Sequence, residues 1–352
     1  MKGLILSGGF GTRLRPLTYS QQKQLIPVAN KPILFYAIED LIEAGVKDIG
    51  IIVGPNKQQV IDTVEGRKWN AHISFIEQAE PLGIAHTIKI AKDFIGQDPF
   101  IMYLGDNILK EGVREHVKTF LDSDVQGSVM LTEVDNPSEF GIATLNEMDD
   151  IIRLDEKPAD PASNLAVIGV YMFRPEVLKA VDEIKPSKRN QLEITDAVQW
   201  LIDNGHKVKS SQVKNWWKDT GKPEDILHAN RLIIDTIRSK NMGVVKGSDI
   251  RGRVQIGKGT IIQKHSTVKG PVIIGKNCQI ENSYIGPYTS IGDHCHLVGV
   301  ELEDSVLLDG VVLQESGRIV DSLIGRNVKI VKKNGFPKGN RFVIGDHSEV
   351  YL

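Results

Sequence analysis

The strongest constraint on the fold is a repeat of six residues in the last third of the chain. Large apolar anchors recur at this spacing at Ile256, Ile262, Val268, Ile274 and Ile280, and after a one-residue deletion at Ile285, Ile291 and Leu297. The residue four positions after an anchor is small, as at Thr260, Ser266, Val272, Cys278, Thr289 and Cys295. Large and small inward positions with a period of six predict a parallel β-helix whose coil has three faces.

Repeats of this kind resemble left-handed β-helices, an exception to the right-handed crossover rule. The three faces that separate Ile280 from Leu297 place Cys278 and Cys295 above one another in adjacent coils, about 4.8 Å apart. These are the only cysteines, too few for a disulfide framework or a zinc site, and we predict two reduced, buried thiols. Three histidines of the repeat could act as the general base of an acyltransferase, namely His265, His294 and His296. The alternative is that they are polar residues on an outward face of the coils.

The character of the chain changes after Lys246-Gly247-Ser248, and 352 residues exceed the usual size of one core. We therefore expect a first domain over residues 1–240, a linker over 241–250, and a β-helix with a C-terminal tail over 251–352. Side-by-side stacking of coils predicts a homo-oligomer. A net charge of −2 gives no footprint for nucleic acid or an anionic membrane. Without a signal peptide or an apolar run of ~20 residues, we expect a cytoplasmic protein.

Before the repeat, apolar strands alternate with helices. Strands are expected at 49–54, 73–76 and 100–104, and helices at 33–42, 58–65 and 83–95, with a further helix at 223–240. This alternation predicts an α/β fold, a Rossmann-like and mostly parallel sheet with helices on both faces. Ligands of such sheets bind at the carboxyl ends of the strands.

The first strand ends in a glycine cluster that is followed at once by cations. Gly8, Gly9 and Gly11 allow successive backbone N–H groups to form an anion-binding nest, which the guanidinium of Arg13 can close. The loop is not a dinucleotide fingerprint, because Leu14 stands where a third glycine is needed, and it is not a Walker loop. A plain strand-to-helix turn is the alternative, but the basic segment at Lys23 favours polyphosphate.

Two aspartates follow predicted strands beside glycine. Asp106 comes directly after the strand at 100–104, and Asp219 follows the strand at 208–213. Two carboxylates at strand ends suit Mg²⁺, which keeps waters and phosphate oxygens as its other ligands. The alternatives are an Asp turn at Asp106 and a surface turn shielded by tryptophans at Asp219.

Together these motifs resemble a known family. Gly8 to Leu14, Lys23-Gln24-Leu25-Ile26-Pro27 and Lys31-Pro32 are similar to the signature of sugar-phosphate nucleotidylyltransferases, and most similar to the glucose-1-phosphate thymidylyltransferases. Matching motifs run from Leu6 to Gly221. The resemblance implies an Mg²⁺-dependent enzyme that joins dTTP, or UTP, to a sugar 1-phosphate.

The resemblance also implies roles for individual residues. The nucleotide would be bound by Leu6, Gly8, Gly9, Gly11, Thr12, Arg13, Lys23, Gln78, Gly83 and Asp106. The sugar would be bound by Asn107, Gly141, Glu156, Lys157, Val167 and Tyr171. The metal would be held by Asp106 and Asp219, and the catalytic residues would be Arg13, Lys23 and Lys157. From the residues alone, the Gln78 amide could pair with the hydrogen-bonding edge of a pyrimidine. Glu156 and Lys157 are equally typical of a solvent-exposed turn. Tyr171 is equally typical of a side chain that packs against a strand.

The expected reaction is an in-line attack of glucose 1-phosphate on the α-phosphorus of dTTP, which gives dTDP-glucose and pyrophosphate without a covalent enzyme intermediate. Three alternatives remain open. They are a uridylyltransferase, which differs by one methyl group in base choice, a bifunctional enzyme with a C-terminal acetyltransferase, and a non-catalytic regulator or scaffold on the same fold.

Overall fold

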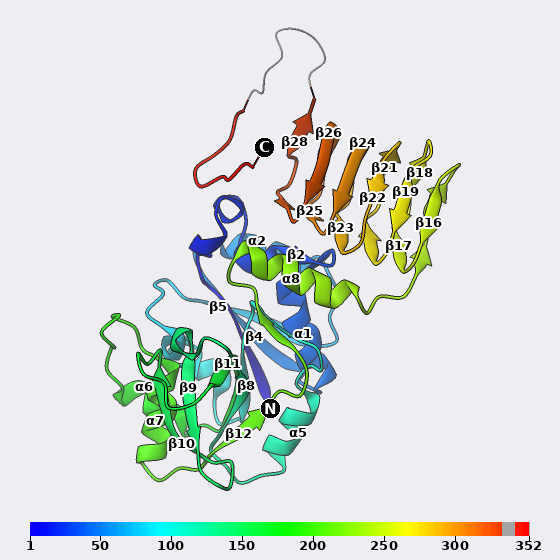
Figure 1. Cartoon of the computed structure of the whole chain (residues 1–352). Coiled ribbons are helices and arrows are strands. Elements are labelled where there is room, and N and C mark those ends of the chain that lie inside the picture. Colours follow the sequence, from blue (N-terminus) through cyan, green and yellow to red (C-terminus); the bar gives the residue numbers. More distant parts are fainter. Residues whose placement is uncertain (333–341, 352) are drawn as a thin grey trace. The chain divides into compact units, whose positions relative to one another are not determined.

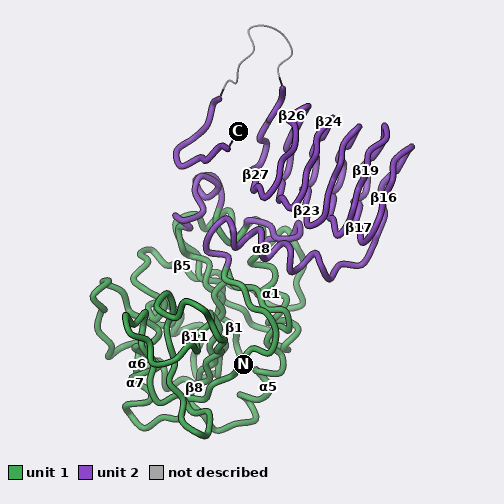
Figure 2. The backbone as a smooth tube through the Cα atoms, viewed as in Figure 1, with its two compact units in different colours: residues 1–10, 22–25, 33–219 green, residues 11–21, 26–32, 220–352 purple. Residues whose placement is uncertain are grey.

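A computed structural model describes residues 1–332 and 342–351 of the chain, so residues 333–341 and Leu352 of the predicted tail lie outside the described residues. The chain forms two compact units (Figure 2). The first contains residues 1–10, 22–25 and 33–219, and the second contains residues 11–21, 26–32 and 220–352. The chain thus passes from one unit to the other four times before residue 34. The predicted boundaries at 240 and 251 stay a prediction.

A nine-stranded mixed sheet is the centre of the first unit (Figure 1). Its main order is β10-β9-β11-β6-β1-β4-β5, with β8 paired to β11 and β12 paired to β8. The strands are β1 Lys2–Ser7, β4 Asp48–Val53, β5 His72–Glu77, β6 Phe100–Leu104, β8 Gly127–Glu133, β9 Gly141–Leu145, β10 Ile151–Glu156, β11 Leu165–Phe173 and β12 Val208–Gln212. The four neighbouring strands β5, β4, β1 and β6 are parallel, as the alternation of strands and helices predicted. The next strand, β11, runs antiparallel to β6.

Alternate residues of these strands enter two separate apolar layers, one on each face of the sheet. Leu4 and Leu6 of β1 pack in one layer, and Ile5 packs in the other. The first layer is covered by α3 Ile84–Ile90, α4 Lys92–Ile95, α6 Val177–Glu183 and α7 Ile194–Asp203. The second is covered by α1 Ile33–Glu43, α2 Lys57–Glu65 and α5 Arg114–Leu121. The α/β prediction is confirmed, although the predicted helix at 83–95 forms as two helices that meet at Ala91.

The second unit contains coils of parallel strands, which confirms the predicted β-helix class. One face consists of β14 Lys240–Asn241, β17 Val254–Ile256, β20 Val272–Ile274, β23 Thr289–Ile291, β25 Val306–Leu307 and β27 Leu323–Ile324. The other strands are β15 Val244–Val245, β16 Asp249–Arg251, β18 Ile261–Gln263, β19 Thr267–Lys269, β21 Gln279–Glu281, β22 Tyr284–Ile285, β24 His296–Glu303, β26 Val312–Val320 and β28 Lys329–Val331. Partners such as Val254 and Val272 are eighteen residues apart, which is three faces of six. The left-handed sense stays a prediction.

The predicted anchors fill the interior of the coils. Each of the eight anchors from Ile256 to Leu297 is at most 3% exposed, and the small residues between them are equally buried. Cys278 and Cys295 are free and buried, as predicted, and the thiol of Cys278 donates a hydrogen bond to the carbonyl oxygen of Gly292 at 3.1 Å. His265 and His294 are exposed at corners with left-handed φ values of 61° and 60°, which favours the outward reading of these histidines.

The helix α8 (Pro223–Ile234) precedes the coils and is shorter than the predicted helix at 223–240. The prediction was wrong beyond Ile234, because Lys240 and Asn241 pair with β17 as the first strand of the coils. Pairing with a neighbouring strand therefore overrides local helical propensity at this point.

A buried asparagine on α8 ties three segments of the second unit together. The Asn230 side-chain Oδ1 accepts hydrogen bonds from the backbone N–H of Ala29 at 3.0 Å and the hydroxyl of Ser290 at 2.6 Å. Its Nδ2 donates to the carbonyl oxygen of Tyr288 at 2.9 Å. Ala29 lies in the turn between β2 (Pro27–Val28) and β3 (Lys31–Pro32). One 1% exposed side chain therefore joins a hairpin, a helix and a coil.

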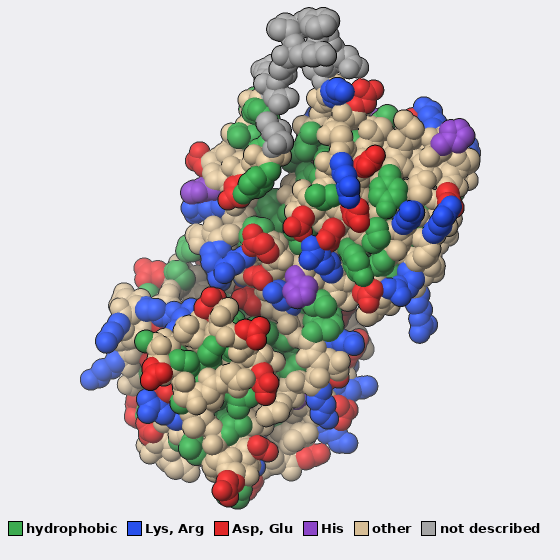
Figure 3. Space-filling model, in the orientation of Figure 1, with side chains coloured by type: hydrophobic (Ala, Val, Ile, Leu, Met, Phe, Trp, Pro, Cys, Tyr) green, Lys and Arg blue, Asp and Glu red, His purple; other side chains and the backbone are tan. Residues whose placement is uncertain are grey.

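The structure contains two further features that bear on its surroundings. Among the described residues, no helix is long and apolar enough to cross a membrane. On the face drawn in Figure 3, basic and acidic side chains are interspersed rather than gathered by sign.

Replacing Asn230 by alanine is expected to lower the free energy of unfolding by about 3 kcal/mol, because each buried polar group that loses its partner costs about 1–3 kcal/mol. Urea denaturation followed by far-ultraviolet circular dichroism measures this loss. The matched control is Glu224→Ala, an exposed change on the same helix that should cost less than about 1 kcal/mol. Equal midpoints for the two variants would contradict the role of Asn230.

Candidate active site

The glycine cluster lies at the carboxyl edge of the parallel strands, close to two other glycines. The N–H of Gly105, after β6, donates to the carbonyl oxygen of Leu6 at 2.9 Å. A Cβ on Gly54, after β4, would lie 2.5 Å from the carbonyl oxygen of Gly8. Three strand ends thus approach one another through bare backbone, at the edge where ligands of such sheets bind.

A glutamine that the sequence analysis missed fastens this loop. The Gln22 side-chain Nε2 donates hydrogen bonds to the carbonyl oxygens of Ser7 at 3.0 Å and Gly9 at 2.7 Å. Its backbone N–H donates to the side chain of Gln59 at 2.9 Å. Gln22 therefore satisfies two loop carbonyls from one buried amide, which fixes the path of the backbone through Gly8.

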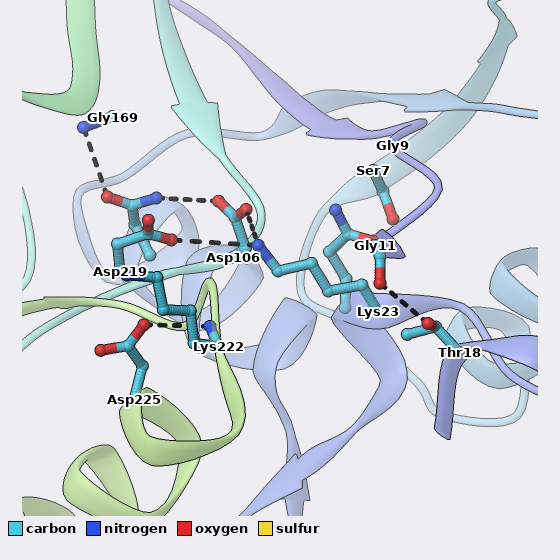
Figure 4. Close-up of polar contacts among 12 residues, drawn as sticks. Ser7, Gly9, Gly11, Thr18, Lys23, Asp106, Gly169, Asp219, Lys222 and Asp225 are labelled. Carbon is cyan, nitrogen blue, oxygen red and sulfur yellow. Dashed lines mark hydrogen bonds and ion pairs between the residues drawn. The ribbon is translucent and has the colours of Figure 1, made fainter. Parts of the chain in front are cut away.

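Lys23 lies between the two predicted metal ligands (Figure 4). Its ammonium nitrogen is 2.5 Å from Oδ2 of Asp106 and 3.9 Å from Oδ1 of Asp219. The side chain of Lys23 is only 8% exposed, and those of Asp106 and Asp219 are 21% and 33% exposed. Three residues that are at least 83 positions apart in sequence therefore form one charged cluster at the carboxyl edge of the sheet.

Two short strands bring the aspartates together. β7 (Asn107–Leu109) pairs antiparallel with β13 (Trp217–Asp219), and the register places Asn107 opposite Asp219. The Asn107 Nδ2 donates to Asp106 at 2.8 Å, and its Oδ1 accepts from the indole of Trp217 at 2.5 Å and the N–H of Gly169 at 3.3 Å. Asn107 is 2% exposed, so it orients the Asp106 carboxylate from inside the fold.

The charge state of Asp106 follows from these contacts. Burial acts to raise the pKa of the Asp106 carboxyl, but the charge and hydrogen bond of Lys23, with the amide of Asn107, lower the pKa below its ordinary value on balance. The carboxylate is therefore ionised at neutral pH.

Of the two residues predicted to bind the base, Gln78 lies close to the glycine loop and Gly83 immediately precedes α3. The side-chain Oε1 of Gln78 lies 3.1 Å from the position that a Cβ on Gly8 would occupy. Gly83 caps α3 with a φ of 114°, and a side chain there would overlap the backbone of Leu192. The N–H of Leu192 donates to the carbonyl oxygen of Leu82 at 2.8 Å. Glycine is required at residue 83 for both conformation and space.

Most of the predicted sugar-binding residues form a second group in the same unit. A Cβ on Gly141 would lie 3.4 Å from Oε2 of Glu156 and 3.7 Å from Cβ of Val167. Glu156 also accepts a hydrogen bond from Arg189 at 2.7 Å. Tyr171 is buried on the same side of the sheet, where burial and then the charge of Glu156 raise the pKa of its phenol well above the ordinary value.

Lys157 follows β10 in a left-handed conformation with a φ of 46°, and its side chain is exposed. Its N–H donates to the carbonyl oxygen of Phe140 at 3.0 Å. The segment after Arg189 leads into α7. The N-cap is Glu193, and its side chain accepts hydrogen bonds from Ser187 and Arg189 instead of capping the helix.

The rest of the glycine loop belongs to the second unit. Gly11 has a left-handed φ of 62°, and its carbonyl oxygen accepts a hydrogen bond from the Thr18 hydroxyl at 2.8 Å. Thr12 and Arg13 begin a short 3₁₀ helix (Thr12–Leu14), and both are exposed. The guanidinium of Arg13 is therefore presented to solvent, and its role in binding stays a prediction.

The cluster of Lys23, Asp106 and Asp219 fits a divalent cation. In this structure, a lysine ammonium is the positive charge that the two carboxylates share. Two carboxylates are the protein ligands that Mg²⁺ typically uses when substrate phosphates and waters supply the others. Mg²⁺ binding would require the ammonium to move toward another anion, and a triphosphate is such an anion.

A glycine loop, a lysine and two aspartates near the carboxyl edge of parallel strands place the chain in the class of open α/β proteins, whose ligands bind at that edge. A comparison with protein families narrows this class. The family model described as nucleotidyl transferase matches residues 2–236, which is more than half of the chain. The chain therefore belongs to the nucleotidyl transferase family.

Full-length relatives agree with this assignment. A glucose-1-phosphate thymidylyltransferase of Streptomyces griseus is 44% identical, covering 100% of this chain and 99% of the relative. The low-salt glycan biosynthesis nucleotidyltransferase Agl11 of Haloferax volcanii is 46% identical, and each chain is covered in full. A bifunctional protein GlmU of Methanocaldococcus jannaschii is 34% identical over 93% of this chain and 78% of the relative.

Solved structures resemble about two thirds of the chain. A Bacillus anthracis protein assigned as a glucose-1-phosphate thymidylyltransferase, in complex with sucrose, has a TM-score of 0.62 and 34% identity. The match covers 68% of this chain and 98% of that one. A UDP-glucose pyrophosphorylase complexed with UDP-glucose has the same TM-score and 26% identity, covering 67% of this chain and 99% of that one.

Replacing Lys23 by methionine is expected to lower the free energy of unfolding at pH 7 by about 3 kcal/mol, because the largely buried Asp106 loses its countercharge. The pKa of Asp106 is lower in the folded state than in the unfolded state. The ion pair therefore contributes its full stabilisation above the unfolded pKa of about 3.9, and this stabilisation is lost as the pH falls through the folded pKa. The difference between wild type and variant should therefore shrink below about pH 4.

Urea denaturation followed by tryptophan fluorescence at several pH values tests this expectation. Lys57→Met is the control, because Lys57 and Glu77 form an exposed pair that should contribute less than about 1 kcal/mol. A Lys23→Met loss that equals the control loss, or that does not change with pH, would contradict the analysis.

Proposed function

We propose that the protein is a glucose-1-phosphate thymidylyltransferase, which converts dTTP and glucose 1-phosphate to dTDP-glucose and pyrophosphate. The observation that carries the proposal is the cluster of Lys23, Asp106 and Asp219 at the carboxyl edge of the sheet. Its support from comparison is the Streptomyces griseus enzyme of that name, which aligns with this chain from end to end.

In the proposed reaction, an oxygen of the sugar 1-phosphate attacks the α-phosphorus of dTTP. The new bond joins that oxygen to the α-phosphorus, and the bond between the α-phosphorus and the bridging oxygen of the β-phosphate breaks, so that pyrophosphate leaves with the electron pair. The nucleophile already carries negative charge, so no general base is needed. The work of the protein is to align two polyanions and to neutralise their repulsion.

The chain's own cations divide this work. Arg13 and Lys23 bind the triphosphate, with Lys23 exchanging the carboxylates for phosphate oxygens. Lys157 binds the phosphate of the sugar, and among the described residues its ammonium forms no ion pair that would have to be broken first. Glu156, beside Gly141 and Val167, accepts hydrogen bonds from sugar hydroxyls. Asn107 keeps the Asp106 carboxylate in place while its partner changes.

Asp106 and Asp219 are the residues that would hold Mg²⁺. The ion, when bound, would neutralise the charge that develops on the phosphate oxygens. Homo-oligomer formation and a cytoplasmic location remain part of the proposal.

A second candidate, a uridylyltransferase, is favoured by the structural similarity to a UDP-glucose pyrophosphorylase. dTTP and UTP differ in the sugar 2′-hydroxyl and the base methyl group, and one methyl group changes the binding free energy by about 1–3 kcal/mol.

Measurement of pyrophosphate release with each nucleoside triphosphate and a panel of sugar 1-phosphates separates the two candidate functions. The highest kcat/KM is expected for dTTP with glucose 1-phosphate. The same panel with glucosamine 1-phosphate and acetyl-CoA tests a second, acyltransferase activity.

Two variants test the assigned roles. Arg13→Ala and Asp219→Asn should each lower kcat/KM about a hundredfold, because removal of one electrostatic contact to the reacting phosphates costs about 3 kcal/mol. Arg318→Ala and Asp182→Asn are the matched controls, since both residues lie in exposed ion pairs, and they should retain wild-type turnover. Full activity of either test variant would rule out its role.

A further inference from the structure

Gln78 is held at the edge of the candidate nucleotide site by its backbone and by one side-chain partner. It follows β5 directly, its N–H donates to the carbonyl oxygen of Val53 at 2.8 Å, and it is only 7% exposed. Its Oε1 is turned toward Gly8, where a Cβ would lie 3.1 Å away. Among the described residues, no hydrogen-bond donor contacts this oxygen.

The partner of the other amide atom is a histidine. The Nε2 of Gln78 lies 3.2 Å from Nδ1 of His86, which is the third residue of α3. The charged groups that face His86 are Lys89, further along the same helix, and Glu80, in the preceding loop. Burial and then Lys89 lower the pKa of His86, and Glu80 acts in the opposite direction, so that the pKa lies below the ordinary 6.5.

The protonation state of His86 decides which way the amide of Gln78 faces. An amide NH₂ group only donates, so the contact requires Nδ1 of His86 to accept, as a neutral imidazole protonated on Nε2 does. A doubly protonated imidazole has no acceptor, and its Nδ1–H would pair with the Oε1 of a reversed amide. His86 and Gln78 are thus a two-state pair in which the histidine controls the amide.

We propose that His86 orients the Gln78 amide so that Oε1 faces the base, which makes the site select bases that carry a ring N3–H. Thymine and uracil have this donor, whereas N3 of cytosine is an acceptor and would face Oε1 without a hydrogen. His86 is a positioning residue, because it acts through Gln78 and does not contact the base. The inference rests on the proposed function and on the predicted contact of Gln78 with the base, and it adds the residue that orients this amide.

A dependence on pH follows from the same pair. As the pH falls through the pKa of His86, below 6.5, the amide reverses and presents its NH₂ group, which pairs with N3 of cytosine. Preference for dTTP over dCTP should therefore decline in acid. The ratio of the two affinities is the proper measure, because protonation of the triphosphate is common to both nucleotides.

Two substitutions separate the hydrogen bond from the shape of the side chain. His86→Asn places an acceptor oxygen where Nδ1 was and does not titrate. His86→Leu removes the acceptor and keeps a side chain of similar bulk.

A third substitution tests the pH dependence. Lys89→Met removes a positive charge that lowers the pKa of His86 without contacting Gln78. The pH below which selectivity is lost should therefore be higher in this variant.

Calorimetric titration of the full-length protein with dTTP and with dCTP, from pH 5.5 to 8, tests the proposal. At pH 7.5, His86→Leu should lower the dTTP-to-dCTP affinity ratio about tenfold, the effect of one hydrogen bond. His86→Asn should retain the ratio at every pH, whereas the wild-type ratio should fall as the pH falls through the pKa of His86. An unchanged ratio in His86→Leu, or a lost ratio in His86→Asn at pH 7.5, would overturn the inference.

Binding also separates this inference from the proposed function. If wild type fails to form dTDP-glucose but binds dTTP in the His86-dependent way, the proposed reaction is wrong and the inference stands. If wild type forms dTDP-glucose while both His86 variants retain the wild-type ratio and its pH profile, the inference alone is wrong. A wild type that binds neither nucleotide would contradict both.

Discussion

The antiparallel pairing of β13 with β7 is the interaction on which the candidate active site depends. It places Asp219 opposite Asn107, although the two residues are more than a hundred positions apart in sequence. The amide of Asn107 then links the backbone of Gly169, the indole of Trp217 and the carboxylate of Asp106. Because two like charges held together repel, the arrangement also needs a cation, and Lys23 supplies it from a nearly buried position. The β7–β13 pairing, the Asn107 amide and the Lys23 ammonium thus together hold the two carboxylates in place.

The two loops that precede and follow the segment of Lys23 in sequence belong to the second unit. They comprise residues 11–21 and 26–32. Within that unit, Asn30 donates to the carbonyl oxygen of Ile291 at 2.6 Å, and the ring of Tyr19 lies 6.1 Å from that of His347. The loops on both sides of Lys23 are therefore packed with the coils and the tail. Tertiary contacts in the second unit restrain the ends of a segment that functions in the first.

Local sequence patterns predicted the parts of the structure in which the same local environment recurs at regular intervals along the chain. The six-residue repeat identified the buried anchors because every coil uses the same positions, and the rule for strand ends pointed to the edge where Gly8 and Asp106 lie. The fold class could be predicted for that reason. Gln22, Trp217 and His86 were missed, because each acts on a residue that only the fold brings near, and a lone polar residue has no periodicity. The end of α8 was missed because strand pairing at Lys240 competes with local propensity.

Charge and hydrogen bonding have different tasks in such a site. dTTP and dCTP carry the same phosphates, so Arg13, Lys23 and a metal ion can align either nucleotide but cannot tell them apart. Selection must come from neutral donors and acceptors on the base. An amide is ambiguous in this respect, because rotation by half a turn exchanges its donor and its acceptor. A buried amide next to a histidine that stays neutral at physiological pH loses this ambiguity without adding charge to a site already crowded with it. In the proposed enzyme, the strongest electrostatic groups therefore determine where the triphosphate lies, and one weak hydrogen bond between neutral groups determines which base it carries.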